Sequence, residues 1–134
     1  MTPHRKDSVP TDAEIRILQV LWAKGPTSVR DVHEVLNAER PAAYTTTLKL
    51  MQIMLEKGLV TRDESERTHI YSAAVAEKQT QRTATADLLG RLFGGSAAAL
   101  MQQALSVKPS SREELRRIRE MLDAVERGEK PTDD

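Results

Sequence analysis

Helix-start and helix-stop signals crowd into residues 11–58, and they constrain the fold more than any other feature of the sequence. Thr11 and Glu14 form a capping box, in which the threonine hydroxyl accepts from the Glu14 amide and the glutamate side chain reaches back. Lys24-Gly25-Pro26 ends that segment, and Thr27-Ser28 supplies the cap of the next one. A chain interrupted this often predicts short helices packed together.

A third helix is predicted at about 43–57, ending at Gly58, the residue type best suited to a left-handed C-terminal turn. Two strand-like runs follow at 59–63 and 68–72, and the polar loop between them is typical of a hairpin. Three short helices followed by a hairpin are the element order of a winged helix-turn-helix. In that fold the third helix recognises DNA.

From about residue 74 the composition changes to Ala, Leu, Gln and Arg, which predicts helical runs near 75–93, 96–106 and 111–127. The predicted fold class is therefore mainly α with a small β-hairpin. It consists of an N-terminal winged helix-turn-helix at 11–73 and a C-terminal helical dimerisation region at 74–127. Residues 1–10 and 128–134 are predicted to be flexible tails.

The last helical run carries a heptad seam, and a short helix with a narrow apolar seam usually needs a partner helix. We expect an intertwined homodimer, because a monomer would leave apolar seams exposed. Packing of the same helices within one chain is the alternative. The candidate dimerisation residues are Leu88, Leu92, Phe93, Leu100, Met101, Leu115, Ile118, Leu122 and Val125.

Composition and charge argue against several classes of function. Lys plus Arg and Asp plus Glu each number 20, so net charge alone gives no argument for nucleic acid. The chain has no cysteine, which excludes disulfides, a thiol nucleophile and cysteine-based metal sites. The three histidines are isolated, so no metal and no cofactor is expected. Without a glycine-rich phosphate loop or clustered His and carboxylates, an enzyme is not expected either.

The apolar runs are shorter than a membrane span, and the polar start of the chain lacks the apolar core of a signal peptide. We therefore expect a cytoplasmic protein that does not insert directly into a membrane.

The predicted third helix has one buried stripe and one exposed face. On a helical wheel the stripe consists of Thr47, Leu50, Met51 and Met54, and the opposite face carries Thr45, Lys49, Gln52 and Glu56, with Thr46 at its flank. In a winged helix this exposed face meets the major groove. There Lys donates to guanine or phosphate, and Thr contacts phosphate or a thymine methyl. For any one threonine, starting the helix is an equally good explanation.

Several motifs carry a resemblance to a known family. They are "TDAEIRILQVLW" ending at Trp22, Tyr44-Thr45-Thr46, "EKGLV" ending at Val60, Leu92-Phe93-Gly94-Gly95 and Glu114-Leu115. Across about 11–125 the chain resembles the penicillinase and methicillin-resistance repressors, the BlaI/MecI/CopY family. The resemblance implies a homodimeric transcriptional repressor that binds a palindromic double-stranded DNA operator. It also implies a membrane sensor with a metalloprotease domain, which triggers cleavage in the C-terminal region and releases the DNA.

Carried over residue by residue, the resemblance puts Thr45, Thr46 and Lys49 at recognition-helix contact positions. Gln52, on the same exposed face, completes the helix part of the predicted DNA-binding set. Arg67, in or beside the hairpin loop, is a candidate contact to phosphate, as is His69. An ordinary solvated loop is the alternative for both residues.

The cleavage junction of the family, an Asn followed by Phe, corresponds to Gln103-Ala104 here, and neither residue matches. The copper-responsive branch binds metal through C-terminal cysteines, which this chain lacks.

Two other functions stay open beside the repressor. The neutral N-terminal half and the apolar flanks of the third helix favour a winged helix that binds protein. A dimeric regulator gated by a small molecule would need a pocket near Phe93, Leu100 and Met101.

Overall fold

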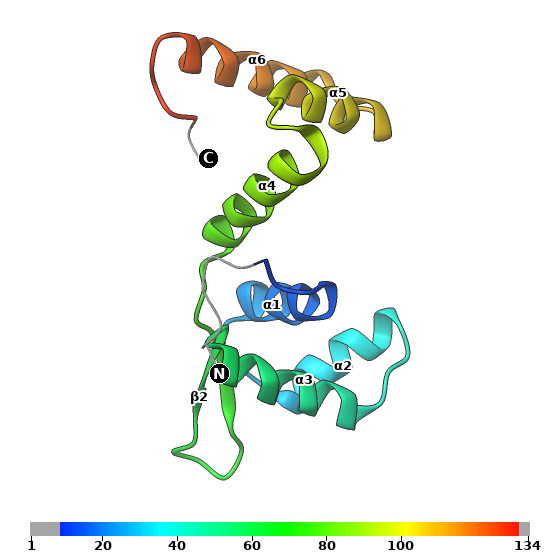
Figure 1. Ribbon diagram of the computed structural model, residues 1–134. Coiled ribbons are helices and arrows are strands. Elements are labelled where there is room, and N and C mark those ends of the chain that lie inside the picture. Colours follow the sequence, from blue (N-terminus) through cyan, green and yellow to red (C-terminus); the bar gives the residue numbers. More distant parts are fainter. Residues whose placement is uncertain (1–8, 132–134) are drawn as a thin grey trace. The chain divides into compact units, whose positions relative to one another are not determined.

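The computed structural model describes residues 9–131, and the chain forms two compact units, Met1–Thr85 and Ala86–Asp134 (Figure 1). Of the two predicted tails, residues 1–8 and 132–134 lie outside the described residues. The elements in chain order are α1 (Asp12–Lys24), β1 (Thr27–Ser28), α2 (Val29–Glu39), α3 (Tyr44–Lys57), β2 (Val60–Asp63), β3 (Ile70–Ala73), α4 (Glu77–Phe93), α5 (Ala97–Val107) and α6 (Arg112–Glu126). This mainly helical fold with one small antiparallel sheet confirms the predicted fold class.

In the N-terminal unit, α1 and α2 begin and α3 ends where the sequence signals predict. The Thr11 hydroxyl accepts from the Glu14 amide at 3.2 Å, and the Glu14 carboxylate accepts from the Thr11 amide at 2.9 Å, which completes the capping box. The Ser28 hydroxyl caps α2 by accepting from the Asp31 amide at 3.2 Å. Gly58 ends α3 in the left-handed conformation with φ 82°.

The sheet contains a third strand that the sequence does not predict. Its strand order is β1-β3-β2, and both pairings are antiparallel. The hairpin pairs Val60 with Ala73, and β1 adds Thr27 opposite Tyr71. A strand of two residues has no periodicity to detect, and the same residues carry the capping signal of α2.

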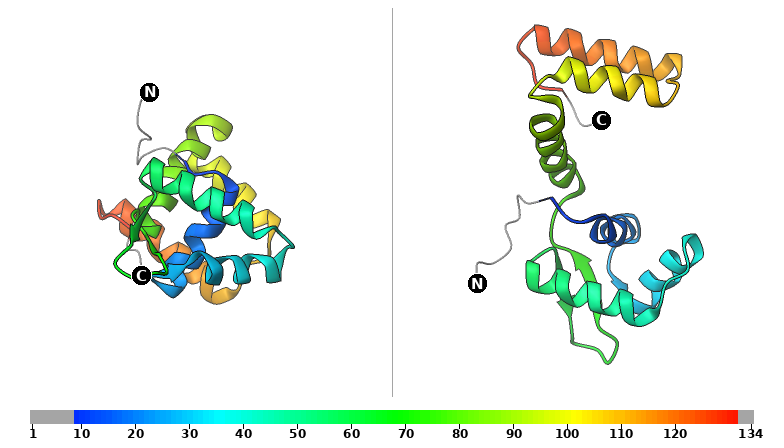
Figure 2. Two further views of the ribbon diagram at one scale, coloured as in Figure 1. Left: turned by 90° about the horizontal axis from the view of Figure 1, so that it is seen from below. Right: turned by 45° about the vertical axis from the view of Figure 1, so that its right-hand side comes forward.

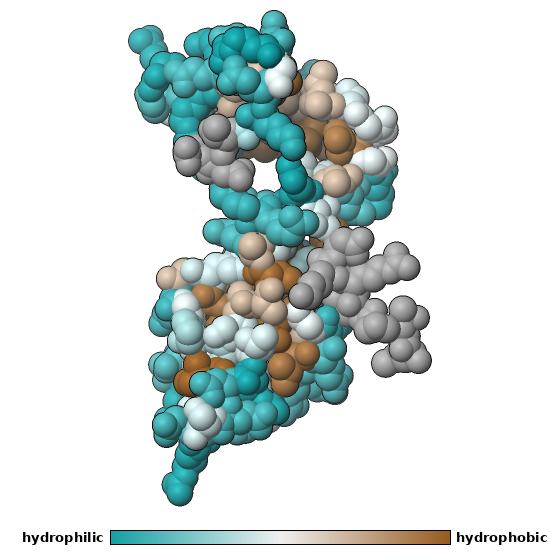
Figure 3. All heavy atoms as spheres, turned by 90° about the vertical axis from the view of Figure 1, so that its left-hand side faces the viewer, coloured by the Kyte–Doolittle hydropathy of each residue, from teal (hydrophilic) through white to brown (hydrophobic). Residues whose placement is uncertain are grey.

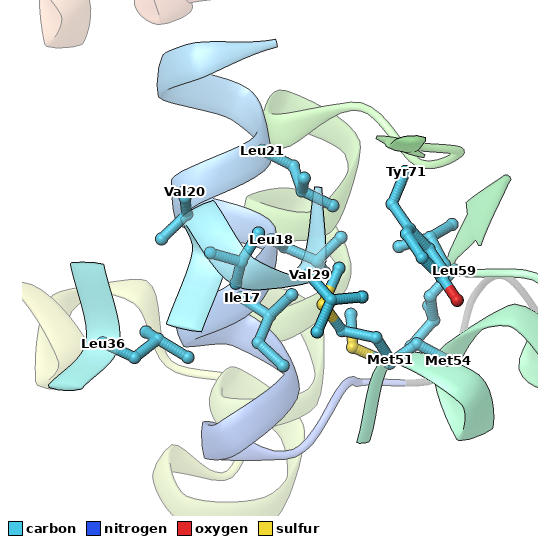
Figure 4. Close-up of a cluster of buried hydrophobic side chains, with 12 residues drawn as sticks. Ile17, Leu18, Val20, Leu21, Val29, Leu36, Met51, Met54, Leu59 and Tyr71 are labelled. Carbon is cyan, nitrogen blue, oxygen red and sulfur yellow. The ribbon is translucent and has the colours of Figure 1, made fainter. Parts of the chain in front are cut away.

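The core of the N-terminal unit lies where α1, α2 and α3 meet the sheet. Figure 4 shows Ile17 and Leu18 of α1 grouped with Met51 and Met54 of α3 and with Tyr71 of β3; each is at most 2% exposed. Burial of these side chains is the main contribution to the stability of the unit. Within the predicted α3 stripe, Thr47 is buried with the two methionines, whereas Leu50 is only half-buried.

A hydrogen bond from Trp22 joins α1 to the segment that follows the sheet. The indole Nε1 donates to the Val75 carbonyl at 2.9 Å, and both side chains pack against the core. The first turns of α4 also belong to the N-terminal unit, because that unit extends to Thr85. Thr80, on this part of α4, is buried, and its hydroxyl donates to the Ala76 carbonyl at 3.0 Å.

The C-terminal unit has a different character, since no described residue between 86 and 131 is buried. The views in Figures 1 and 2 agree that α5 and α6 run alongside each other. Large apolar side chains stay at the surface, including Val107 at 78%, Leu92 at 65% and Leu122 at 56% exposure. Hydrophobic side chains interrupt the hydrophilic surface in Figure 3. Within residues 9–131, no helix is long and apolar enough to span a membrane.

Candidate nucleic-acid interface

The N-terminus of α3 is exposed and has no side-chain cap. Its N-cap is Ala43, whose side chain makes no capping hydrogen bond, and the Thr45 and Thr46 side chains that follow are exposed. These threonines therefore do not serve as the N-cap of the helix. Amides of an uncapped first turn and the positive end of the helix dipole together favour a negatively charged group.

Thr47 has a structural role instead. It is 2% exposed, and its hydroxyl lies 3.2 Å from Nδ1 of His33 on α2. The His33 ring also packs edge-to-face against Tyr44, with 5.5 Å between the ring centroids. The contact satisfies a buried hydroxyl and holds α2 against α3, the two helices of the helix-turn-helix.

An ion pair fixes the other end of α3. Nζ of Lys57 donates to Oε2 of Glu14 at 2.7 Å, and the Glu14 side chain is only 2% exposed. Burial raises the pKa of Glu14, but the hydrogen bonds from Lys57 and Thr11 and the Lys57 charge outweigh it, so the net pKa is lowered. Contacts near both ends thus set the position of α3 within the unit.

A groove of about 490 Å³ lies between the start of α2, one flank of α3 and the hairpin. Its basic side chains are Arg30 from α2 and Arg62, Arg67 and His69 from the hairpin. Tyr44, Leu48 and Gln52 line the α3 side, one helical turn apart from each other. The three arginines bring positive charge to the groove in a chain whose net charge is zero.

Arg62 is the best anchored of these basic groups. Its Nη1 donates to the Tyr71 hydroxyl at 3.4 Å, its guanidinium lies 6.0 Å from the centroid of that ring, and its Nη2 pairs with Glu64 at 3.1 Å. The hydrogen bonds to Tyr71 and then to Glu64 raise the pKa of Arg62. Its Nε is buried and donates to no acceptor.

The hairpin, which is the predicted wing of the winged helix-turn-helix, carries acidic residues as well as basic ones. Asp63, Glu64 and Glu66 lie between Arg62 and Arg67 along this segment. The Ser65 amide donates to the Asp63 carboxylate at 2.9 Å, and hydrogen bonds from the Ser65 backbone and side chain lower the pKa of Asp63. In Figure 1 this loop extends away from the helices of the unit.

The structure sorts the predicted DNA-binding residues into two neighbouring groups. Gln52 and Arg67 line the groove. Thr45, Thr46 and Lys49 line a second hollow of about 330 Å³ on α3, together with Leu50 and Ile53.

Arg30 and Arg62 line the groove but are not among the residues that the sequence predicts to bind DNA. Strand alternation contains a signal for Arg62, because it shares a face of β2 with buried Val60. Arg30 offers no comparable signal, since an exposed arginine in the first turn of a helix is an ordinary surface residue.

The predicted dimerisation residues lie on α4, α5 and α6. Six of them are half-buried within the chain, namely Leu88, Phe93, Leu100, Met101, Leu115 and Ile118. Leu92, Leu122 and Val125 are at least half exposed. Gln103 and Ala104, at the position of the family's cleavage junction, are both exposed within α5. Among the described residues, no group of three or more His, Cys, Asp or Glu could hold a metal ion.

Comparisons with known proteins agree on one family. The penicillinase repressor family model matches residues 10–124. A transcriptional regulator BlaI from Mycobacterium tuberculosis is 31% identical over 116 residues, covering 84% of each chain. The methicillin resistance regulatory protein MecI from Mammaliicoccus sciuri is 19% identical over 112 residues, covering 84% of this chain and 91% of its own.

A solved structure supports the fold. The solution structure of the DNA-binding domain of the repressor BlaI matches 56% of this chain and 92% of its own length, with a TM-score of 0.50 and 19% sequence identity. At this identity the match concerns the fold of the N-terminal part.

Proposed function

The chain belongs to the penicillinase repressor family of transcriptional regulators, and from this premise we propose that it is a homodimer whose α3 enters the major groove of a palindromic operator. As a member of a repressor family, the protein is not an enzyme. The proposal places a DNA-binding domain at 11–73, a dimerisation domain at 74–127 and the site of action in the cytoplasm.

The uncapped α3 terminus beside a basic groove carries the proposal. Thr45, Thr46 and Lys49 are exposed on the first turns of α3. The two threonines are short, which lets the helix end come close to the DNA backbone. Lys49 is the residue we assign to a base edge or a phosphate, and Gln52 lies one turn further along the same face. Arg67, across the groove from Gln52, is assigned to a backbone phosphate.

In the proposed dimer, a chain with no net charge can still bind DNA tightly. Two winged helices joined in one dimer bind two half-sites, so the second binding event is intramolecular and gains a high effective concentration. The exposed Leu92, Leu122 and Val125 support the dimer, because they leave apolar surface that a partner chain can cover.

The proposal includes release from DNA by an inducing signal, relayed in this family by a membrane sensor metalloprotease. Gln103-Ala104 lies inside α5, and a protease needs an extended chain at the bond that it cuts. Cleavage at this position would therefore require local unfolding of the helix.

A fluorescence anisotropy titration tests the DNA-binding proposal. The purified chain is titrated against its own upstream promoter DNA and against a scrambled duplex, at two salt concentrations. We expect Lys49→Ala to weaken promoter binding by about fivefold or more, and Thr46→Ala to weaken it less. Lys78→Ala, which removes the same charge from an exposed position on α4, is the control and is expected to change binding by less than about twofold.

Equal binding of the wild-type chain to both duplexes, or no binding at all, would contradict the repressor proposal. Either result would favour the winged helix that binds protein. The half-buried Leu48, Leu50 and Ile53 on the flanks of α3 would then be the first candidates for its contact surface.

A further inference from the structure

Glu64 bridges two basic side chains of the hairpin. Its Oε2 pairs with Nη2 of Arg62 at 3.1 Å, and its Oε1 lies 3.8 Å from Nε2 of His69. Both basic residues line the groove beside α3. A carboxylate oxygen paired with the Arg62 guanidinium occupies the kind of position that an oxygen of a bound phosphate takes.

We propose that Glu64 occupies, in the free protein, the place that a backbone phosphate of DNA takes on Arg62 in the complex. The inference rests on the proposed DNA-binding function and goes beyond it. It assigns a phosphate-binding role to Arg62 and identifies Glu64 as an internal competitor that lowers the affinity for DNA.

Arg62 is suited to receive a phosphate because it has a second contact that does not involve Glu64. The Tyr71 hydroxyl accepts from Nη1 at 3.4 Å, and Tyr71 itself is 2% exposed in the core. An arginine held in this way presents the planar fork of donors that matches phosphate oxygens. Because Nε is buried without an acceptor, the pairing with Glu64 leaves one donor of Arg62 unsatisfied.

The Glu64 side chain can move away from Arg62. Its side chain is 56% exposed, so the carboxylate regains water when it leaves Arg62. Exposed ion pairs are weak, and a polyanion can therefore displace it. The exchange replaces one anion on Arg62 by another, while Glu64 moves into solvent.

Glu64 is expected to compete with the backbone phosphates of DNA of any sequence. Phosphate contacts position a protein but carry no sequence information, so Glu64 lowers the affinity for operator and scrambled DNA by the same factor. Its removal is therefore expected to tighten both complexes and to leave their ratio unchanged.

Glu64→Gln and Glu66→Gln form a matched pair of variants. Each removes one negative charge from the same loop and keeps the shape of the side chain, but only Glu64 pairs with Arg62. The full-length chain and both variants are titrated by anisotropy against the upstream promoter and the scrambled duplex, over a series of salt concentrations. We expect Glu64→Gln to tighten binding to both duplexes by about threefold to fivefold, and Glu66→Gln by less than about twofold.

A double-mutant cycle connects the effect to Arg62. In an Arg62→Gln background, whose folding is checked by circular dichroism, the gain from Glu64→Gln is expected to fall to the level of Glu66→Gln. Equal gains from the two single variants would overturn the inference, as would a gain from Glu64→Gln that persists without Arg62. If the wild-type chain binds the promoter specifically but Glu64→Gln and Glu66→Gln tighten binding equally, only the inference about Glu64 is contradicted. If neither the wild-type chain nor any variant binds DNA, the proposed function is contradicted as well.

Discussion

At the scale of single residues, the ion pair between Glu14 and Lys57 is the contact that ties the end of α3 to α1. Glu14→Gln keeps the side chain's shape and its hydrogen bond from the Thr11 amide, but it removes the charge opposite Lys57. Lys57 is 32% exposed, so water can take over part of its solvation. We expect the free energy of unfolding to fall by about 1–2 kcal/mol at pH 7, measured by urea denaturation.

The pH dependence of this effect follows from the lowered pKa of Glu14. A carboxylate with a folded pKa below its ordinary value of 4.5 stabilises the fold fully above that value, and the stabilisation disappears as pH falls through the lowered pKa. The difference between the wild-type chain and Glu14→Gln should therefore be present at pH 7 and shrink below about pH 4.5. Glu39→Gln, at the exposed ion pair with Arg16, is the control and should cost less than about 0.5 kcal/mol.

At the scale of elements, a glycine stabilises the end of α3 but destabilises the interior of α4. Gly58 ends α3 with φ 82°, and an added Cβ would meet nothing within 4 Å, so any cost of Gly58→Ala is backbone strain alone. We expect that variant to lose about 1 kcal/mol of stability. Gly90 lies inside α4 with equally open surroundings, so Gly90→Ala should gain up to about 1 kcal/mol through helix propensity. Thermal unfolding followed by circular dichroism compares them, and a shift in the same direction for both would contradict this account.

Local signals explain which elements the sequence could predict. The capping box at Thr11, the cap at Ser28 and the stop at Gly58 each act within a few residues, so α1, α2 and α3 are found close to their actual bounds. The sequence does not predict β1, because this strand exists only through pairing with β3, which is distant in sequence. Propensity and periodicity contain no information on such a partner.

In the candidate site, too, features of a single element can be predicted from the sequence, whereas contacts between elements cannot. The exposed face of α3 follows from helical periodicity, and Thr45, Lys49 and Gln52 are indeed exposed, but their contact with DNA stays a prediction. The role of Arg62 is recognised only from its hydrogen bond to Tyr71 on the paired strand. The role of Thr47 is recognised only from its contact with His33 on another helix. Contacts between elements therefore decide which polar residues are structural and which stay free to bind.

At the scale of the whole molecule, the two units differ in how completely they bury apolar surface. The N-terminal unit has a core of fully buried side chains, whereas no described residue of the C-terminal unit is buried. Since folding must offset the loss of chain entropy by burial, a helical unit without buried residues needs further apolar contacts. In the proposed homodimer a second copy of the chain supplies them.

Leu122→Asp tests the proposed dimer. Leu122 is 56% exposed on α6 and belongs to the heptad seam, so a charge there would be desolvated in a dimer but would stay in water in a monomer. We expect the variant to be monomeric in analytical ultracentrifugation and to lose operator binding at the same time. Arg112→Asp places the same side chain in the exposed first turn of α6, where an acidic residue suits the helix dipole, and should stay dimeric. A Leu122→Asp chain that still dimerises and binds DNA would contradict the assignment of Leu122 to the dimer interface.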